Sequence, residues 1–171
     1  MGYTVRRTTA DEWREFRELR LEALLDSPMN FGQTHEQALA HPDELWQERA
    51  QTNATSGVQA FYVAVDDATG KLVGMWGVMP HNAHPGVHHM LGVYVRPEAR
   101  GTDVARRLNQ ACVDFTWTTD AKELTLLVRD DNDRGRRFYE REGFVLTGVK
   151  EPHNLDPSHD LVEMRYAIRS L

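Results

Sequence analysis

The segment from Leu91 to Ala105 combines residue types that suit the binding of a phosphorylated ligand. An apolar, strand-like run is followed by a short polar turn that contains Arg100 and Gly101, and then by the start of a helix. Such a connection points several backbone N–H groups at one place, where the helix dipole attracts an anion and glycine permits close approach. The pattern predicts a pyrophosphate-binding turn, although an ordinary strand-to-helix connection has the same pattern.

A second polar segment runs from Val128 to Phe144 and contains the end of a strand, a turn, a short helix and a glycine. Asn132 and Tyr139 lie seven residues apart in it, which is about two helical turns and puts both on one helix face. Both side chains can therefore reach one ligand. Taken alone, however, Tyr139 is more simply explained as an aromatic residue packed in the core.

In this order and at this spacing, the two segments resemble the GNAT superfamily of acetyl-CoA-dependent N-acetyltransferases. The first resembles the pyrophosphate motif of that family, Arg/Gln-x-x-Gly-x-Gly/Ala. The second resembles its element with Asn, then Tyr, then Gly-Phe. The paired motifs extend from Leu91 to Phe144, and the expected order of helices and strands extends the resemblance over nearly the whole chain.

The resemblance implies roles for the matching residues in holding acetyl-CoA, the acyl donor. It implies that Asn132 hydrogen-bonds the coenzyme near its pantetheine and that Tyr139 lies by the thioester sulfur, where a phenol can protonate the departing thiolate. The pantetheine arm would run like an added strand along the backbone of Val93, Tyr94 and Val95. The pyrophosphate would be held by the backbone amides of Arg100, Gly101, Thr102, Asp103, Val104 and Ala105.

Asp103 departs from the family motif, because it stands where the family usually has glycine. A carboxylate beside a pyrophosphate is unfavourable, but Asp is also common in the first turn of a helix, where its side chain can point to solvent. Two functions therefore stay open. One is an N-acetyltransferase that moves an acetyl group to a primary amine by direct attack, as Tyr139 favours. The other, which Asp103 favours, is a degenerate acyl-CoA-binding or sensing module without catalysis.

Four histidines could supply a general base for the amine, because imidazole titrates near neutral pH. His88 and His89 occupy a predicted strand, so their side chains point to opposite faces and at most one can face a cleft. His81 and His84 precede them in a loop. The alternative is that these are surface histidines without a catalytic role.

Hydrophobic periodicity predicts the elements that must position these residues. The expected strands are Tyr3–Arg7, Phe61–Asp66, Leu72–Met79, His88–Val95, Leu124–Val128, Phe144–Lys150 and Leu161–Ile168. The expected helices are Thr9–Asp26, Gln33–Gln51 with a break near Pro42, Thr102–Trp117 and Asn132–Glu142, with Gly143 as the residue after the last helix. The order β-α-α-β-β-β-α-β-α-β-β describes one mixed α/β (α+β) domain over residues 1–171. The resemblance adds a mostly antiparallel central sheet flanked by helices.

Composition and net charge indicate where the protein is located and which classes of partner it binds. The formal net charge of the 171 residues is −6, so we expect neither nucleic-acid nor membrane binding. The single cysteine, Cys112, and the lack of an apolar leader or long apolar run favour a cytoplasmic protein. No Cys, Asp or Glu set accompanies the histidines, so no metal is expected.

The expected acceptor is a small-molecule or peptide amine, and the expected assembly is a monomer or homodimer. The acidic balance mildly favours a cationic acceptor. Carboxylates that could bind its positive charge are those of Glu22, Asp26, Glu36 and Asp160, although each is also explained as a solvated surface group.

Overall fold

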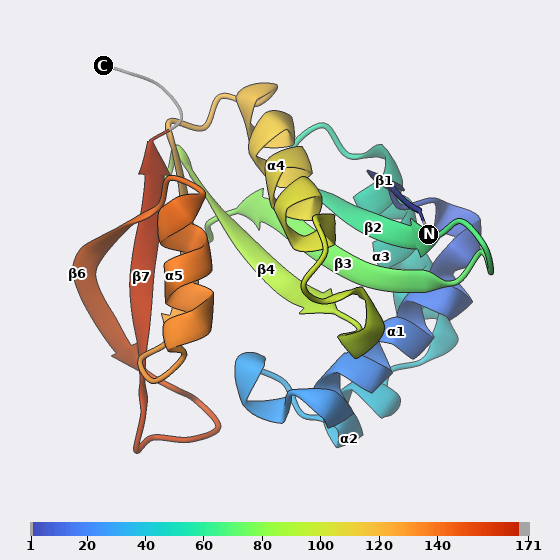
Figure 1. Cartoon of the computed structure of the whole chain (residues 1–171), viewed down its shortest axis with the longest axis horizontal. Helices are drawn as coiled ribbons and strands as arrows, with labels where there is room; N and C mark the ends of the chain where they lie inside the picture. The colour runs from blue at the N-terminus through green and yellow to red at the C-terminus, as the bar shows by residue number, and fades with distance from the viewer. Residues whose placement is uncertain (1, 168–171) are drawn as a thin grey trace.

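The structure, a computed structural model, describes residues 2–167. Seven strands form one sheet in the order β1-β2-β3-β4-β5-β7-β6 (Figure 1). Among the described strands, only β4 and β5 pair in parallel, so the expected mostly antiparallel sheet is confirmed. The strands are β1 (Tyr3–Arg7), β2 (Ala60–Asp66), β3 (Leu72–Pro80), β4 (Val87–Val95), β5 (Glu123–Arg129), β6 (Val145–Pro152) and β7 (Asp160–Ala167). The predicted end of the last strand, Ile168, lies outside the described residues.

Helices form where periodicity and capping residues predict them. They are α1 (Trp13–Asp26), α2 (His35–Leu39), α3 (Asp43–Thr55), α4 (Val104–Trp117) and α5 (Asp133–Arg141). Pro42 separates α2 from α3, because proline disfavours helical geometry in the residue before it. Gly143 follows α5 with a φ of 99°. The main difference lies at the first helix, where a 3₁₀ turn (Ala10–Glu12) precedes the α-helical geometry.

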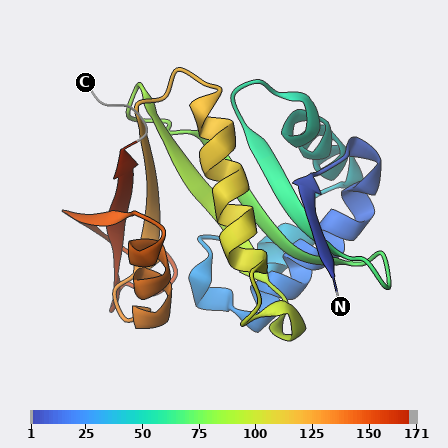
Figure 2. The ribbon, with the colours of Figure 1, turned by 45° about the horizontal axis from the view of Figure 1, so that its top comes forward.

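Two helical layers cover the two faces of the sheet (Figures 1 and 2). On one face, α4 and α5 contribute Leu108, Cys112 and Tyr139 to a core that includes Trp76 and Leu124 from the sheet. On the other face, α1, α2 and α3 pack against β2 and β3 in a second core. Within residues 2–167, no helix combines the length and apolar character needed to cross a bilayer.

Strand β4 is irregular where the sequence predicted the coenzyme. Gly92 and Val93 together oppose Trp76 of β3, which is a β-bulge. Gly92 has a φ of 63°, a left-handed conformation that glycine adopts without a steric penalty. Pairing of β4 with β5 extends only from Val87 to His89. Beyond that point the two strands separate, and the β4 edge on the β5 side is left without a partner strand.

Candidate active site

A cleft of 410 Å³ lies between this open edge of β4 and helix α5, and we call it the β4–α5 cleft. Most of the residues that the resemblance assigns to the coenzyme line it. They are Val93, Tyr94, Val95, Arg100, Gly101, Ala105, Asn132 and Tyr139. Three assigned residues, Thr102, Asp103 and Val104, do not line it. The structure therefore brings the two sequence motifs together around one opening.

The Arg100–Gly101 turn is fastened to the sheet and to α1 by side-chain contacts. Arg100 Nε donates to the Val95 carbonyl at 2.8 Å, and its Nη2 lies 2.7 Å from an Asp26 carboxylate oxygen. This hydrogen bond holds the pKa of Asp26 below its usual value. Gly101 has a φ of 77°. In the part of the chain that the structure describes, no acceptor bonds the N–H groups of Gly101, Thr102 and Asp103, so they remain available to an anion.

The Asp103 side chain turns away from the cleft. Its carboxylate is 54% exposed and lies 3.8 Å from both Arg106 and Arg107. Thr102 is likewise occupied, since its hydroxyl donates to the Ala99 carbonyl at 2.6 Å, while Val104 is buried in the core. These residues can therefore contribute only backbone groups to a ligand in the cleft.

Helix α5 places Tyr139, and Asn132 at its N-cap, on the wall of the cleft. Asn132 caps the helix, because its Oδ1 accepts the Gly135 N–H at 2.9 Å. The Tyr139 ring packs 6.1 Å from Trp76 and 5.6 Å from Phe144, measured between ring centroids. Both Asn132 and Tyr139 also line a smaller space of 130 Å³ between the separated strands, the splay cavity. Tyr139 is thus both a core aromatic residue and a wall of the cleft.

Burial raises the pKa of Tyr139 well above its ordinary value. The phenol therefore keeps its proton near neutral pH and can act as a donor. Burial also raises the pKa of Tyr94 to about 12.

The two strand histidines point in opposite directions, as the alternation of a strand requires. His88 Nε2 lies 2.8 Å from the Val58 carbonyl, and its side chain lines none of the spaces around Gly92. His89 instead lines a 620 Å³ space between β4 and the β6–β7 end, the histidine cavity. Its Nε2 is buried and has no partner among the described residues. Burial, together with nearby His81, lowers the pKa of His89, so the ring is neutral and can accept a proton.

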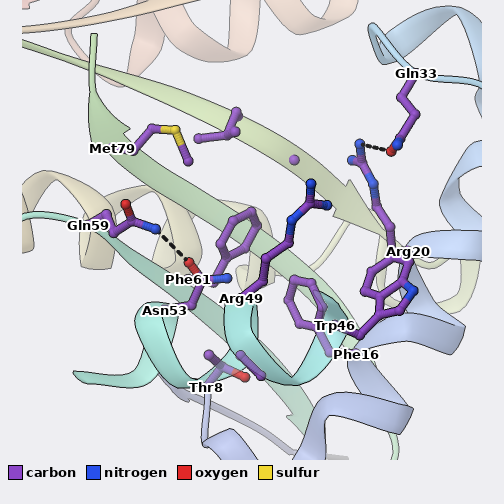
Figure 3. Close-up of a pocket in the computed structure, with 13 residues that line it drawn as sticks. Thr8, Phe16, Arg20, Gln33, Trp46, Arg49, Asn53, Gln59, Phe61 and Met79 are labelled. Atoms are coloured by element: carbon purple, nitrogen blue, oxygen red, sulfur yellow. Dashed lines mark hydrogen bonds between the residues drawn. The ribbon is translucent and has the colours of Figure 1, made fainter. Parts of the chain in front are cut away.

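A fourth space of 410 Å³, the arginine cavity, lies under α1 and α3 (Figure 3). Arg20 and Arg49 extend into it from these helices. Phe61 of β2 and Gly92 of β4 also line it. No acidic residue lines it, so the expectation of a cationic acceptor finds no support in this wall. The two carboxylates of α1 that the sequence suggested for a cationic acceptor, Glu22 and Asp26, do not line this cavity either. They bond arginines elsewhere, Glu22 with Arg96 and Asp26 with Arg100.

Five residues of these spaces were not singled out by the sequence. Arg134 and Arg141 line the β4–α5 cleft, and the four arginines of α5 in an acidic chain were an available signal. Gly92 was available as an isolated glycine in a strand pattern, which often marks a bulge. Nothing in the sequence pattern indicates Arg20 or Arg49, because each is an ordinary polar position of its helix.

One cluster of potential metal ligands lies elsewhere among the described residues, at the end of β5. Its members are Asp130, Asp131 and His159. His159 Nδ1 lies 2.8 Å from Asp130, and Arg129 lies 2.9 Å from Asp131. The carboxylates are thus occupied by His159 and Arg129, and Asp130, Asp131 and His159 line none of the four spaces, so we assign no metal to them.

Known proteins resemble this chain in sequence. Residues 12–144 match the model of the acetyltransferase (GNAT) family. The peptidyl-lysine N-acetyltransferase YjaB of Escherichia coli K12 is 31% identical over 78 residues, which cover 46% of this chain. The chain spans about half the length of this curated relative, 50%.

Solved structures share the fold. A GNAT acetyltransferase from Streptococcus pneumoniae has a TM-score of 0.83 at 14% identity, covering 98% of this chain and all of that one, 100%. The Salmonella typhimurium protein yncA, solved with its cofactor acetyl-CoA, has a TM-score of 0.76 at 17% identity and covers 100% of this chain and 96% of its own. Since the family match spans more than half of the sequence and includes both motifs of the β4–α5 cleft, the chain belongs to the acetyltransferase (GNAT) family.

Proposed function

We propose that the protein transfers the acetyl group of acetyl-CoA to a primary amine by direct attack. The observation that carries this proposal is the convergence of Tyr139 and the unpaired, bulged edge of β4 in one cleft. The acetyl-CoA of the Salmonella structure and the peptidyl-lysine acceptor of the E. coli relative support the donor and the amine.

The residues of the β4–α5 cleft fit acetyl-CoA, which supplies an acetyl group as a thioester. The free N–H groups of the turn after Gly101 begin the 14-residue helix α4, and such a helix start suits a pyrophosphate. Arg134 and Arg141 add positive charge to the wall. The β4 edge from Val93 to Val95 has no partner strand on this side and can pair with an extended amide chain such as pantetheine.

The chemistry requires one proton to leave the amine and one to reach the sulfur. As the C–N bond forms, a backbone N–H of β4 at the bulge near Val93 stabilises the negative oxygen. As the C–S bond breaks, Tyr139 donates its proton to the sulfur. His89 accepts the proton of the amine through water, and solvent returns one to Tyr139. The result is an amide and a free thiol.

A coenzyme sensor without catalysis is the second candidate, and Asp103 was its support. The exposed Asp103 carboxylate, paired with Arg106 and Arg107 and outside the cleft, weakens that support. The protonated Tyr139 in the cleft favours the transferase.

Titration with acetyl-CoA, followed by measurement of thiol release with a panel of amines, tests the proposal. We expect 1:1 coenzyme binding and thiol release that depends on both the protein and the amine. Dephosphorylated pantetheine thioesters should bind more weakly, because they lack the pyrophosphate. Tight coenzyme binding with no amine-dependent thiol release across the panel would support the sensor instead.

A further inference from the structure

We propose that the acceptor is a small amine that carries a carboxylate, and that Arg20 and Arg49 bind this carboxylate in the arginine cavity. This inference rests on the proposed function and specifies its acceptor. It assigns a substrate-binding role to two side chains that lie outside the coenzyme cleft.

The two arginines share the cavity without an anion from the protein. Among residues 2–167, no carboxylate oxygen lies within 4.0 Å of either guanidinium. Arg20 Nη2 donates to the Gln33 side-chain oxygen at 3.2 Å (Figure 3). The Arg20 guanidinium lies 4.6 Å from the centre of the Phe31 ring. These neutral contacts hold the guanidinium in place but leave its charge uncompensated.

Several partly buried arginines elsewhere in the protein are paired with carboxylates, although Arg7 bonds only backbone carbonyls and Arg17 Nε has no partner among the described residues. Arg6 bonds Glu12 at 2.8 Å, Arg96 bonds Glu22 at 3.1 Å, and Arg129 bonds Asp131 at 2.9 Å. Charged side chains removed from water are normally paired. Burial, reinforced by the charge of Arg49, instead lowers the pKa of Arg20 to about 10. An anionic ligand would relieve this repulsion, and a carboxylate matches the planar fork of a guanidinium.

The position of Arg20 limits the size of the acceptor. A Cβ built on Gly92 would lie 3.9 Å from Arg20 Nη1, and Gly92 also borders the splay cavity and the histidine cavity. A carboxylate on Arg20 therefore lies beside the bulge at which the acetyl group is proposed to react. Only a few bonds can separate the carboxylate from the attacking nitrogen. An amino acid meets this condition, whereas the side chain of a lysine within a protein does not.

The remaining wall of the cavity favours an apolar portion next to the carboxylate. Phe16, Trp46, Phe61 and Met79 contribute apolar surface, and the polar groups there are neutral apart from the two arginines. We therefore expect amino acids with apolar side chains to be better acceptors than those with acidic or basic side chains.

The test compares apolar α- and β-amino acids with their primary amides, and with an amidated lysine peptide, under saturating acetyl-CoA. We expect kcat/KM for each acid to exceed that of its amide by at least about tenfold, the size expected for a charge-assisted hydrogen bond. Arg49→Gln and Arg20→Met should bring this ratio close to one, mainly by raising KM. Arg14→Gln, which removes an exposed arginine that stacks on Trp13 outside the cavity, should leave the ratio unchanged.

Equal rates for acids and amides, or a ratio that Arg49→Gln leaves intact, would overturn the inference while leaving acetyl transfer standing. If no amine releases thiol, the proposed function has failed. Calorimetry with the same acids and amides then decides the inference: binding of the acids that Arg49→Gln abolishes supports it, and equal or absent binding overturns it.

Discussion

The β4–α5 cleft and the arginine cavity have the same volume, 410 Å³, and both reach strand β4, yet they present positive charge differently. In the cleft, Arg100 is bonded to Asp26 and to the Val95 carbonyl. This side chain thus holds the turn, and the free backbone N–H groups that begin at Gly101 are the groups proposed to bind the coenzyme. In the arginine cavity, Arg20 and Arg49 have no such anion and are themselves exposed to the ligand.

The difference indicates how a chain with a net charge of −6 can place positive groups in both spaces. Many of its carboxylates are bonded to arginines, as Glu22 and Asp26 are. Net charge therefore describes the surface as a whole and says little about a cavity. Substitutions should therefore separate the two sites if, as proposed, the coenzyme is bound mainly by backbone groups and the acceptor by side chains.

Tyr139→Phe should give the largest effect, because this residue is the proposed proton donor of the chemical step. We expect kcat to fall by roughly 10²–10⁴, with coenzyme affinity and thermal stability nearly unchanged, since the ring keeps its contacts with Trp76 and Phe144. Steady-state kinetics and calorimetry measure this. Tyr62→Phe, on β2 and outside all four spaces, is the matched control. Normal turnover by Tyr139→Phe, when chemistry limits the rate, contradicts the acid role.

His89→Gln should lower kcat/KM by roughly 10²-fold at pH 7, the lower end for loss of a general base. Burial lowers the pKa of His89 below 6.5. As the pH falls through this lowered pKa, the ring becomes protonated and kcat/KM should decrease. The neutral form is favoured in the folded state, so its contribution to stability is present above pH 6.5 and is lost as pH falls.

His88 is the matched control for this pH profile. Burial also lowers its pKa, so it contributes to stability with the same sign. His88 does not line the spaces around Gly92, however. His88→Gln should therefore still show the decrease of kcat/KM at low pH. If both His88→Gln and His89→Gln still show the decrease of kcat/KM at low pH, His89 is not the base.

Gly92→Ala should impair both sites together, because Gly92 borders the arginine cavity and forms the bulge beside the cleft. Its φ is 63°, and an added Cβ would lie 2.7 Å from the Phe61 ring. We expect the free energy of unfolding to fall by about 1–2 kcal/mol and kcat/KM to fall at least about tenfold through misplacement of β4. Gly57→Ala, whose Cβ meets nothing within 4 Å, is the control for denaturation and kinetics. Unchanged kinetics in Gly92→Ala would show that the bulge is dispensable.

The residues that line the β4–α5 cleft were largely predictable from the sequence, because they come from two segments that are each local in the chain. Arg100, Gly101 and the start of α4 are neighbours, and Asn132 and Tyr139 share one short helix. Hydrophobic alternation predicted the strands, and Pro42 and Gly143 predicted where helices break or end. Two parts escaped prediction. The free edge of β4 depends on where β5 leaves it, which no local pattern records.

The arginine cavity was not predictable for a related reason. Its walls come from α1, α3, β2, β3 and β4, so Arg20 and Arg49 meet only after the chain has folded. On their own helices, both are ordinary polar positions. The absence of an acidic partner is also invisible in the sequence, where Glu18 and Glu22 stand close to Arg20 and Glu48 stands next to Arg49.

Arg141→Gln should weaken coenzyme binding without changing acceptor binding. Arg141 is an exposed residue of the cleft wall, and exposed charge contacts are worth less than about 1 kcal/mol, so we expect the Kd of acetyl-CoA to rise about two- to fivefold. The effect should shrink at high ionic strength, and the KM of the acceptor should not change. Arg106→Gln, which alters an exposed arginine outside the cleft, is the control. An equal loss in both variants would indicate only a general effect of charge.

Asp103→Asn should give the smallest effect, and it tests whether the departure from the family motif matters. A carboxylate that opposed the pyrophosphate would weaken coenzyme binding, so its removal would tighten it. The Asp103 carboxylate is 54% exposed, lies 3.8 Å from Arg106 and Arg107, and does not line the cleft. We therefore expect the Kd of acetyl-CoA, measured by calorimetry, to change by less than about twofold. Ala105→Asp places a carboxylate on the cleft wall and should weaken binding clearly, which verifies that the assay detects such repulsion. A tenfold tightening in Asp103→Asn would mean that the carboxylate reaches the pyrophosphate after all, and that the cleft is less open to anions than its backbone indicates.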